Sequence, residues 1–165
     1  MDETRRFALD HNFPGVFLDA FRQMMPYVEL VPVSDIDRGF PDLDDWELLR
    51  ELYLRHPVWD GLVTNDRNML SLAKEMTVLD QTGLTLVVAT GEGHNPVRAV
   101  GVLLCHMKHI CHHTTRERAQ IWELRVTQKD CDAPEAYLRR IAARHGTSVA
   151  KLHEMNKLSA SQLRR

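Results

Sequence analysis

Val63-Thr64-Asn65-Asp66-Arg67-Asn68-Met69-Leu70 is the stretch that decides the fold of this chain. It begins at the end of an apolar strand, passes through a polar turn and leads into a helix, which is the repeating step of an α/β domain. Asp66 lies in that turn, at the start of the predicted helix. An aspartate there commonly caps the helix by accepting a backbone hydrogen bond. Its carboxylate can also bind a metal ion.

Strand and helix patterns alternate along the chain on both sides of this stretch. Predicted strands are short apolar or β-branched runs at residues 7–9, 28–33, 58–64 and 84–88, with a fifth, edge strand at 121–126. Apolar residues recur at helical spacing at residues 14–25, 45–55, 68–75 and 95–112. The unbroken apolar run at 84–88 is typical of a parallel strand covered on both faces. We therefore predict a three-layer α/β/α fold around a mostly parallel sheet of four or five strands.

The end of the chain differs in charge from the rest. Residues 1–115 contain 10 basic and 17 acidic residues, a net charge of −7, whereas residues 116–165 contain 11 and 6, a net charge of +5. We predict that the α/β domain spans residues 1–127 and that a basic helical extension spans residues 128–165. An acidic body with a basic tail suits a protein that binds a cation and attracts a polyanion. It equally suits a solvated tail without such a role.

Composition places the chain among ordinary globular proteins. Of its 165 residues, 44% are hydrophobic and 27% are charged. No apolar run approaches the roughly 20 residues that cross a bilayer, and the first residues lack the apolar core of a signal peptide. We therefore expect a cytoplasmic protein without a membrane partner. The three cysteines, Cys105, Cys111 and Cys131, are an odd number without CxxC spacing, which argues against a disulfide framework.

Three aspartates are predicted to meet at one edge of the sheet. Asp10 follows the first strand, Asp66 follows the third, and Asp45 begins the helix between the second and third strands. In a parallel sheet, sites form outside the carboxyl ends of the strands, where the strand order changes direction. Crowded carboxylates repel one another unless a cation lies between them, and Mg²⁺ and Mn²⁺ prefer oxygen ligands. We therefore predict that these three aspartates are catalytic metal ligands.

The same aspartates lie in segments that resemble a known family. Three segments resemble, in order and spacing, the acidic signatures of PIN-like nuclease domains of the compact Mut7-C type: Leu9-Asp10-His11-Asn12-Phe13-Pro14, Asp45-Trp46-Glu47-Leu48-Leu49 and Leu62-Val63-Thr64-Asn65-Asp66. The resemblance covers about residues 5–113. It implies a ribonuclease that cuts single-stranded RNA with Mg²⁺ or Mn²⁺, of the kind found as toxins of bacterial toxin–antitoxin pairs. It also implies that Asn12 and Thr64 support the metal-binding carboxylates.

Other polar residues near these aspartates are candidates for contacting the substrate or a metal. Asn65, Arg67 and Asn68 adjoin Asp66, and Arg98 follows the fourth strand, so the two arginines could bind a phosphate. A solvent-exposed arginine is the alternative for Arg98. Many PIN-like domains have a fourth acidic residue, for which the sequence offers three candidates, with a turn role also open to the last: Asp44, Glu47 and Asp60.

RNA is thus the predicted partner, and an antitoxin protein and a second copy of the chain are further candidate partners. The main alternative is a non-catalytic module that binds nucleic acid or protein with the basic tail, through Arg139, Arg140, Arg144 and Lys151. Another phosphoryl-transfer or phosphatase reaction at the same acidic site is a third possibility. His109 and His113, four residues apart in a predicted helix, could share a zinc ion, but no recognised ligand spacing completes that site.

Overall fold

The computed structural model describes residues 4–90, 95–125 and 131–164. Its centre is a sheet in which all the described strands are parallel and follow the order β2-β1-β3-β4-β5. The strands are β1 (Arg5–Leu9), β2 (Val28–Pro32), β3 (Gly61–Thr64), β4 (Thr85–Val88) and β5 (Gln120–Glu123). The parallel sheet and its edge strand β5 confirm the predicted fold class. The predicted end of the last strand at residue 126 lies outside the described residues.

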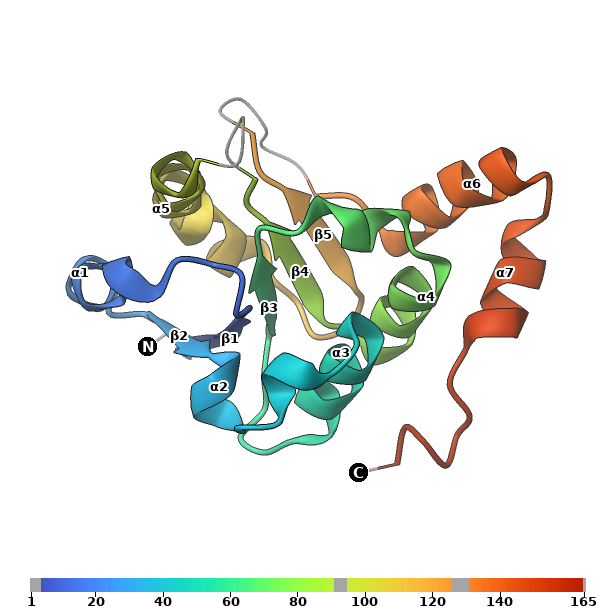
Figure 1. Ribbon diagram of the computed structural model, residues 1–165, viewed down its shortest axis with the longest axis horizontal. Helices are drawn as coiled ribbons and strands as arrows, with labels where there is room; N and C mark the ends of the chain where they lie inside the picture. Colours follow the sequence, from blue (N-terminus) through green and yellow to red (C-terminus); the bar gives the residue numbers. More distant parts are fainter. Residues whose placement is uncertain (1–3, 91–94, 126–130, 165) are drawn as a thin grey trace.

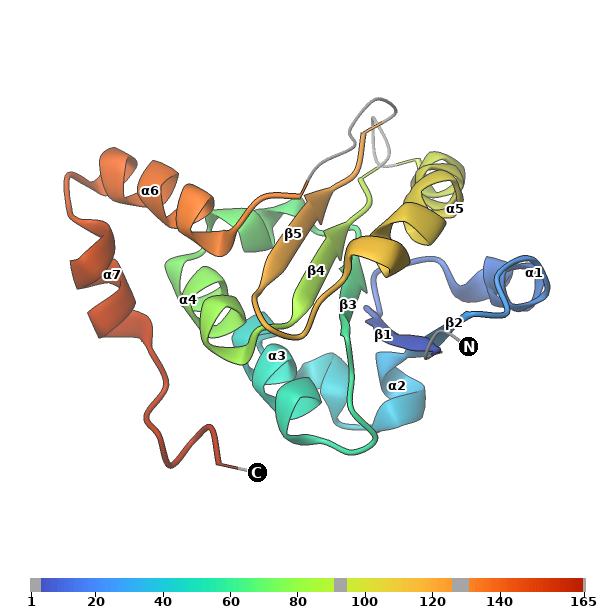
Figure 2. The ribbon, with the colours of Figure 1, turned by 180° about the vertical axis from the view of Figure 1, so that it is seen from behind.

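Helices cover both faces of the sheet, which gives the predicted three layers (Figures 1 and 2). One face carries α1 (Leu18–Met24) and α5 (Pro96–His113). The opposite face carries α3 (Asp45–Leu54), α4 (Ala73–Thr82) and α6 (Pro134–His145), with α7 (Val149–Asn156) packed against α4 and α6. Within the described part of the chain, no helix is both long enough and apolar enough to cross a membrane.

Alternating side chains of the strands fill the two cores. Leu62 and Leu86, which are register partners, face α3 and α4, whereas Val63 and Val87 face α1 and α5. All four are fully buried. Because successive residues of a strand point to opposite faces, a strand covered on both sides is apolar at nearly every position; Thr85 is the polar residue of β4 and is also buried. This burial on both faces explains the largely apolar run at residues 84–88.

The last two crossover connections place their helices on opposite faces. The steps from β3 to β4 and from β4 to β5 run in the same direction across the sheet. Yet α4 packs on one face and α5 on the other. The two crossovers therefore have opposite handedness, and since nearly all such connections are right-handed, one of them is an exception. As a result α5 shares a layer with α1 and lies beside the ends of β4 and β5.

Local structure differs from the prediction in the segment that follows the Asp66 turn. The helix predicted at residues 68–75 is a 3₁₀-helix, η3 (Arg67–Ser71), followed by α4, which runs on to Thr82. Leu72 is extended between them. The apolar spacing ran through this break because Met69 and Met76 are both buried. The short helix α2 (Val33–Ile36) and the 3₁₀-helices η1 (Gly15–Phe17) and η2 (Phe40–Asp42) complete the described helices.

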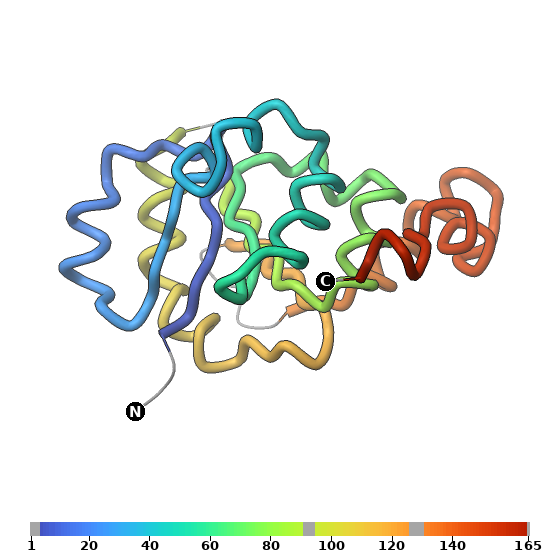
Figure 3. The backbone as a smooth tube through the Cα atoms, turned by 90° about the horizontal axis from the view of Figure 1, so that it is seen from below, coloured from blue at the N-terminus to red at the C-terminus, as the bar shows by residue number. Residues whose placement is uncertain are grey.

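The C-terminal segment packs onto the sheet's α3 and α4 side. Tyr137, Ile141 and Leu158 are buried in the same core as α4. The side chain of Gln81 fixes Leu158 by donating to its carbonyl oxygen at 3.0 Å and accepting from its N–H at 2.6 Å. Figure 3 shows the last residues returning from α6 and α7 toward the body of the molecule. Helices α6 and α7 agree with the predicted helical extension, and the proposed domain boundary at residue 127 lies outside the described residues.

Candidate functional site

Asp10 is the first residue after β1, and it is only 3% exposed. Its Oδ2 accepts a hydrogen bond from the Thr64 hydroxyl at 2.7 Å, and its Oδ1 lies 2.9 Å from Nδ1 of His11. The backbone N–H of Asp10 donates to the carbonyl oxygen of Val63 at 2.9 Å. The neighbours of β1 are β2 and β3, so the strand order changes direction here. Asp10 therefore lies at the point where α/β sheets bind ligands.

Hydrogen bonds connect Asp10 through Thr64 to Asp66. The hydroxyl oxygen of Thr64 accepts the backbone N–H of Asp66 at 3.0 Å. Oδ1 of Asp66 in turn accepts the backbone N–H of Asn68 at 2.8 Å, so Asp66 caps η3. Asn65 steadies the same turn because its side-chain amide donates to the carbonyl oxygen of Asn12 at 2.8 Å. The cap uses one oxygen of Asp66 and leaves Oδ2 for another ligand.

Asp45 is the first residue of α3 but does not cap it. Asp44 is the N-cap, and its backbone N–H donates to the Glu47 carboxylate at 3.1 Å in a capping box. The structure thus assigns helix capping to two of the candidates for a fourth acidic ligand. Asp45 is half-buried, and Asp10 and Asp66 are among its charged neighbours.

Electrostatics place Asp45 in the same region as the other two aspartates. Burial raises the pKa of Asp45, the charges of Asp10 and Asp66 raise it further, and His11 opposes them. Like charges raise a carboxyl pKa because each disfavours the ionised form of the other. The three aspartates predicted from the sequence therefore interact across β1, β3 and α3.

Glu75 is a fourth carboxylate near this group, and it was not among the residues predicted from the sequence. It lies in the first turn of α4 and is buried. Burial raises the pKa of Glu75, and the charges of Asp45 and Asp44 add to this increase. Lys74, its neighbour, lies over the Trp46 ring at 4.7 Å, which shows how closely the starts of α3 and α4 approach. A signal existed in the sequence, since a glutamate beside the core residue Met76 is unusual on a buried helix face.

Asp60 lies at the other end of β3 and does not join the site. Its Oδ1 is 3.0 Å from Arg5 Nη1 and 3.0 Å from Arg116 Nε, and its Oδ2 accepts the backbone N–H of Arg6 at 2.8 Å. Its side chain is fully buried. Asp60 was one candidate for a fourth acidic residue of the site. In the structure it instead connects the amino ends of β1 and β3.

Glu123 ends β5 and forms a second charged cluster at the carboxyl edge. The register aligns Thr64 with Val88 and Val88 with Glu123, so Glu123 lies level with Thr64. Its Oε1 is 2.7 Å from Arg67 Nε and 3.4 Å from Arg125 Nη2. The Tyr137 hydroxyl donates to Oε2 at 3.3 Å. Burial and the Glu123 charge raise the pKa of Tyr137 to about 12. This cluster was not predicted from the sequence, because it forms only when η3 and α6 come beside the end of β5.

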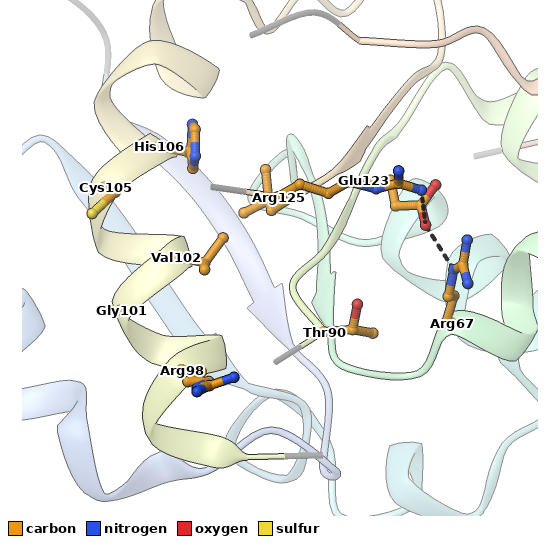
Figure 4. Close-up of a pocket in the computed structure, with 10 residues that line it drawn as sticks. Arg67, Thr90, Arg98, Gly101, Val102, Cys105, His106, Glu123 and Arg125 are labelled. Carbon is orange, nitrogen blue, oxygen red and sulfur yellow. Dashed lines mark hydrogen bonds and ion pairs between the residues drawn. The ribbon is translucent and has the colours of Figure 1, made fainter. Parts of the chain in front are cut away.

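A pocket of about 720 Å³ adjoins the Glu123 cluster. Figure 4 shows Arg98, Gly101, Val102 and Cys105 along α5 on one side, with Glu123, Arg67 and Thr90 on the other. Arg67 and Arg98, the two arginines considered as phosphate contacts, both line this pocket. Arg98 is exposed in the first turn of α5, which agrees with the alternative of a solvent-exposed arginine.

The acidic group fits a hard cation in chemistry but is not a preformed cage. Within residues 4–90, 95–125 and 131–164, no three His, Cys, Asp or Glu side chains are grouped so that they could hold a metal ion. Mg²⁺ usually retains several waters and takes only one or two protein carboxylates. Asp10 and Asp66, which share the Thr64 hydroxyl as a hydrogen-bonding partner, supply a set of that size.

His109 and His113 of α5 contact other groups of the protein. His109 and His113 lie with ring centroids 4.1 Å apart, and Nδ1 of His113 is 2.8 Å from the carbonyl oxygen of His109. Both rings also contact the ring of Trp122. The zinc alternative gains no support from this arrangement.

Comparisons of the chain with protein-family models, with curated proteins and with solved structures found no match. The resemblance to PIN-like nucleases stays a prediction that rests on three sequence segments. The residues at the carboxyl edge of the sheet are therefore the basis for a functional proposal.

Proposed function

We propose that the chain is a Mg²⁺- or Mn²⁺-dependent endoribonuclease that cleaves single-stranded RNA at the carboxyl edge of the sheet. The observation that supports this most is the position of Asp45, whose pKa is raised by burial and by the charges of Asp10 and Asp66. Carboxylates kept together in this way lower stability unless a cation joins them. A perturbed pKa among neighbouring carboxyl groups is also typical of functional sites.

Asp10 and Asp66 would hold the metal, and the charge of Asp45 would add to the attraction for a cation. When bound, the metal would activate a water molecule and stabilise the charge that develops on the phosphodiester. The Thr64 hydroxyl donates to the Asp10 carboxylate and accepts the backbone N–H of Asp66, so it fixes the Asp10 carboxylate relative to the turn that carries Asp66. Nδ1 of His11 lies 2.9 Å from Oδ1 of Asp10, so the imidazole also contacts this carboxylate.

Polar side chains next to Asp66 would position the RNA. Arg67 and Asn68 are both exposed, and Arg67 directs its Nε to Glu123. A guanidinium carries five N–H donors, so Arg67 can bind a phosphate while it keeps this contact. Asn65, held to Asn12, would keep the turn in place. A role as the toxin of a toxin–antitoxin pair, with an antitoxin or a second copy as a partner, belongs to the same proposal.

The test is cleavage of a single-stranded RNA in Mn²⁺ by the Asp10→Asn and Asp66→Asn variants. We expect each to lose activity by about a thousandfold, which corresponds to about 4 kcal/mol of transition-state stabilisation. Asp42→Asn is the matched control, since Asp42 is an exposed aspartate of η2, and it should keep full activity. Circular dichroism and thermal melting show whether each variant is folded. Full cleavage in EDTA, or by Asp10→Asn, would refute the proposal.

A second candidate function is nucleic-acid binding by α6 without catalysis. Arg139 and Arg144 are exposed on this helix, although Arg139 also pairs with Glu135 at 2.7 Å. Removing the C-terminal segment would not test this idea cleanly, because Leu158 and Ile141 are part of the core. The double variant Arg139→Gln, Arg144→Gln keeps the core intact. RNA binding that is lost in this variant, with no cleavage by the wild-type chain, would favour the binding module.

A further inference from the structure

The pocket beside Glu123 has the size and the mixed lining of a small-ligand site. Its volume is about 720 Å³, within the roughly 300–1,000 Å³ of such sites. Val102 of α5 and Leu124 after β5 form an apolar part of its wall. Arg67, Arg98 and Arg125 bring positive charge from three separate segments of the chain (Figure 4).

Positive charge exceeds negative charge among the described residues that line this pocket. Glu123 is the carboxylate among them, against the guanidiniums of Arg67, Arg98 and Arg125. Its side chain is 9% exposed and binds Arg67 at 2.7 Å and Arg125 at 3.4 Å. Glu123 thereby fixes two arginines at the rim while it neutralises only one unit of charge. The guanidiniums of Arg67 and Arg125 each carry N–H donors beyond those that bind Glu123.

We propose that this pocket binds a phosphomonoester dianion carried on a nucleoside, such as the terminal phosphate of a nucleic-acid strand. The excess of two positive charges matches a dianion, whereas an internal phosphodiester carries a single charge. Arginine is also the side chain best suited to bidentate phosphate binding. Val102 and Leu124 would contact the sugar or the base. That the ligand is a strand end rests on the proposed function, whereas the phosphate pocket itself needs no metal.

Gly101 offers a way to close the pocket without disturbing the fold. It lines the pocket in the middle of α5, and a Cβ built on it meets no atom within 4 Å. A larger side chain there would project into open space rather than into the core. Replacing a helix-interior glycine also favours the helix. Gly101→Leu should therefore remain folded while it fills the site.

The experiment is calorimetric titration of the full chain with adenosine 5′-monophosphate in EDTA and low salt. We expect binding that weakens as salt is added, weaker binding of inorganic phosphate and none of adenosine. Arg67→Gln should lower the affinity about tenfold or more, which is the range for loss of a charged hydrogen bond. Gly101→Leu should lower it by at least as much, because its side chain fills the pocket. Val97→Ala, an exposed change on the same helix outside the pocket, should leave the affinity unchanged.

Two results would overturn the proposal. One is an affinity for adenosine equal to that for the monophosphate, and the other is unchanged monophosphate binding by a folded Gly101→Leu variant. A titration with no binding at millimolar ligand would do the same. Because EDTA is present throughout, failure of the metal site leaves this binding intact. Conversely, an empty pocket leaves metal-dependent cleavage by Asp10 and Asp66 standing, so the two proposals can fail separately.

Discussion

Two buried aspartates lie at opposite ends of the central strands, and their surroundings differ. Asp60, before β3, is bound by the guanidiniums of Arg5 and Arg116 at 3.0 Å each. Asp10, after β1, is bound by the Thr64 hydroxyl and by His11, and its charge adds to that of Asp45. The two aspartates are buried to a similar extent. They differ in the charges around them, which are arginines for Asp60 and include a carboxylate for Asp10.

This contrast indicates what each edge of the sheet is for. A buried carboxylate that is fully paired with guanidiniums holds structure, because removing it leaves unpaired buried charge. A carboxylate surrounded by other carboxylates lowers stability in the free protein and gains from a cation. We infer that the amino edge stabilises the fold. Under the proposed function, the carboxyl edge gives up stability in the free protein in order to bind a cation.

The largest difference in stability is expected between Asp60→Asn and Asp10→Asn. Asp60→Asn should lower the free energy of unfolding by about 2–3 kcal/mol, because Arg5 and Arg116 lose their charged partner. Asp10→Asn should cost about 1 kcal/mol or less, since an amide can still accept from the Thr64 hydroxyl. Urea denaturation followed by fluorescence measures both. Equal losses in the two variants would remove the distinction between the edges.

Mn²⁺ should stabilise the wild-type chain through the carboxyl edge. A ligand that binds only the native state at one hundred times its Kd adds about 2.7 kcal/mol of stability. We expect a rise in Tm with Mn²⁺ that EDTA reverses and that Asp66→Asn abolishes. Asp60 is remote from this edge, so a folded Asp60→Asn variant should show the full rise. An identical rise in the Asp66→Asn variant would show that Mn²⁺ binds elsewhere.

Asp45→Asn should have the smallest effect and the opposite sign. Because burial and neighbouring charges raise the pKa of Asp45, removing its charge should stabilise the metal-free protein at neutral pH by about 0.5–1 kcal/mol, the scale of partly exposed charge interactions. Thermal melting in EDTA measures the change. A lower Tm in this variant would mean that Asp45 makes a net favourable contact.

The pH dependence of stability follows from the same residue and from Glu75. Their folded-state pKa values lie above the unfolded values of 3.8 and 4.5, so the native state binds more protons in that interval. Their contribution is therefore fully present below the unfolded values and is lost as pH rises through the folded values. The double variant Asp45→Asn, Glu75→Gln should show a shallower fall in stability above about pH 4 than the wild type.

Local patterns in the sequence predicted most of the fold. The apolar run at residues 84–88 and the helical spacing at 95–112 depend on side-chain period, which each segment carries by itself. The helix start at Asp44 and Asp45 and the cap at Asp66 follow from short-range hydrogen bonding, and both are confirmed. That Asp10 and Asp66 lie at the same edge follows from parallel strands alone.

Tertiary structure alone decided the composition of the carboxyl edge. Glu75 approaches Asp45 because α4 packs on α3, and Glu123 meets Arg67 and Tyr137 because β5 pairs with β4 while α6 covers its face. These contacts join residues separated by 14 to 56 positions. No local pattern encodes them, since each depends on how whole elements dock. The sequence by itself therefore determined the layers and the three aspartates, and packing decided which charges surround them and where the pocket lies.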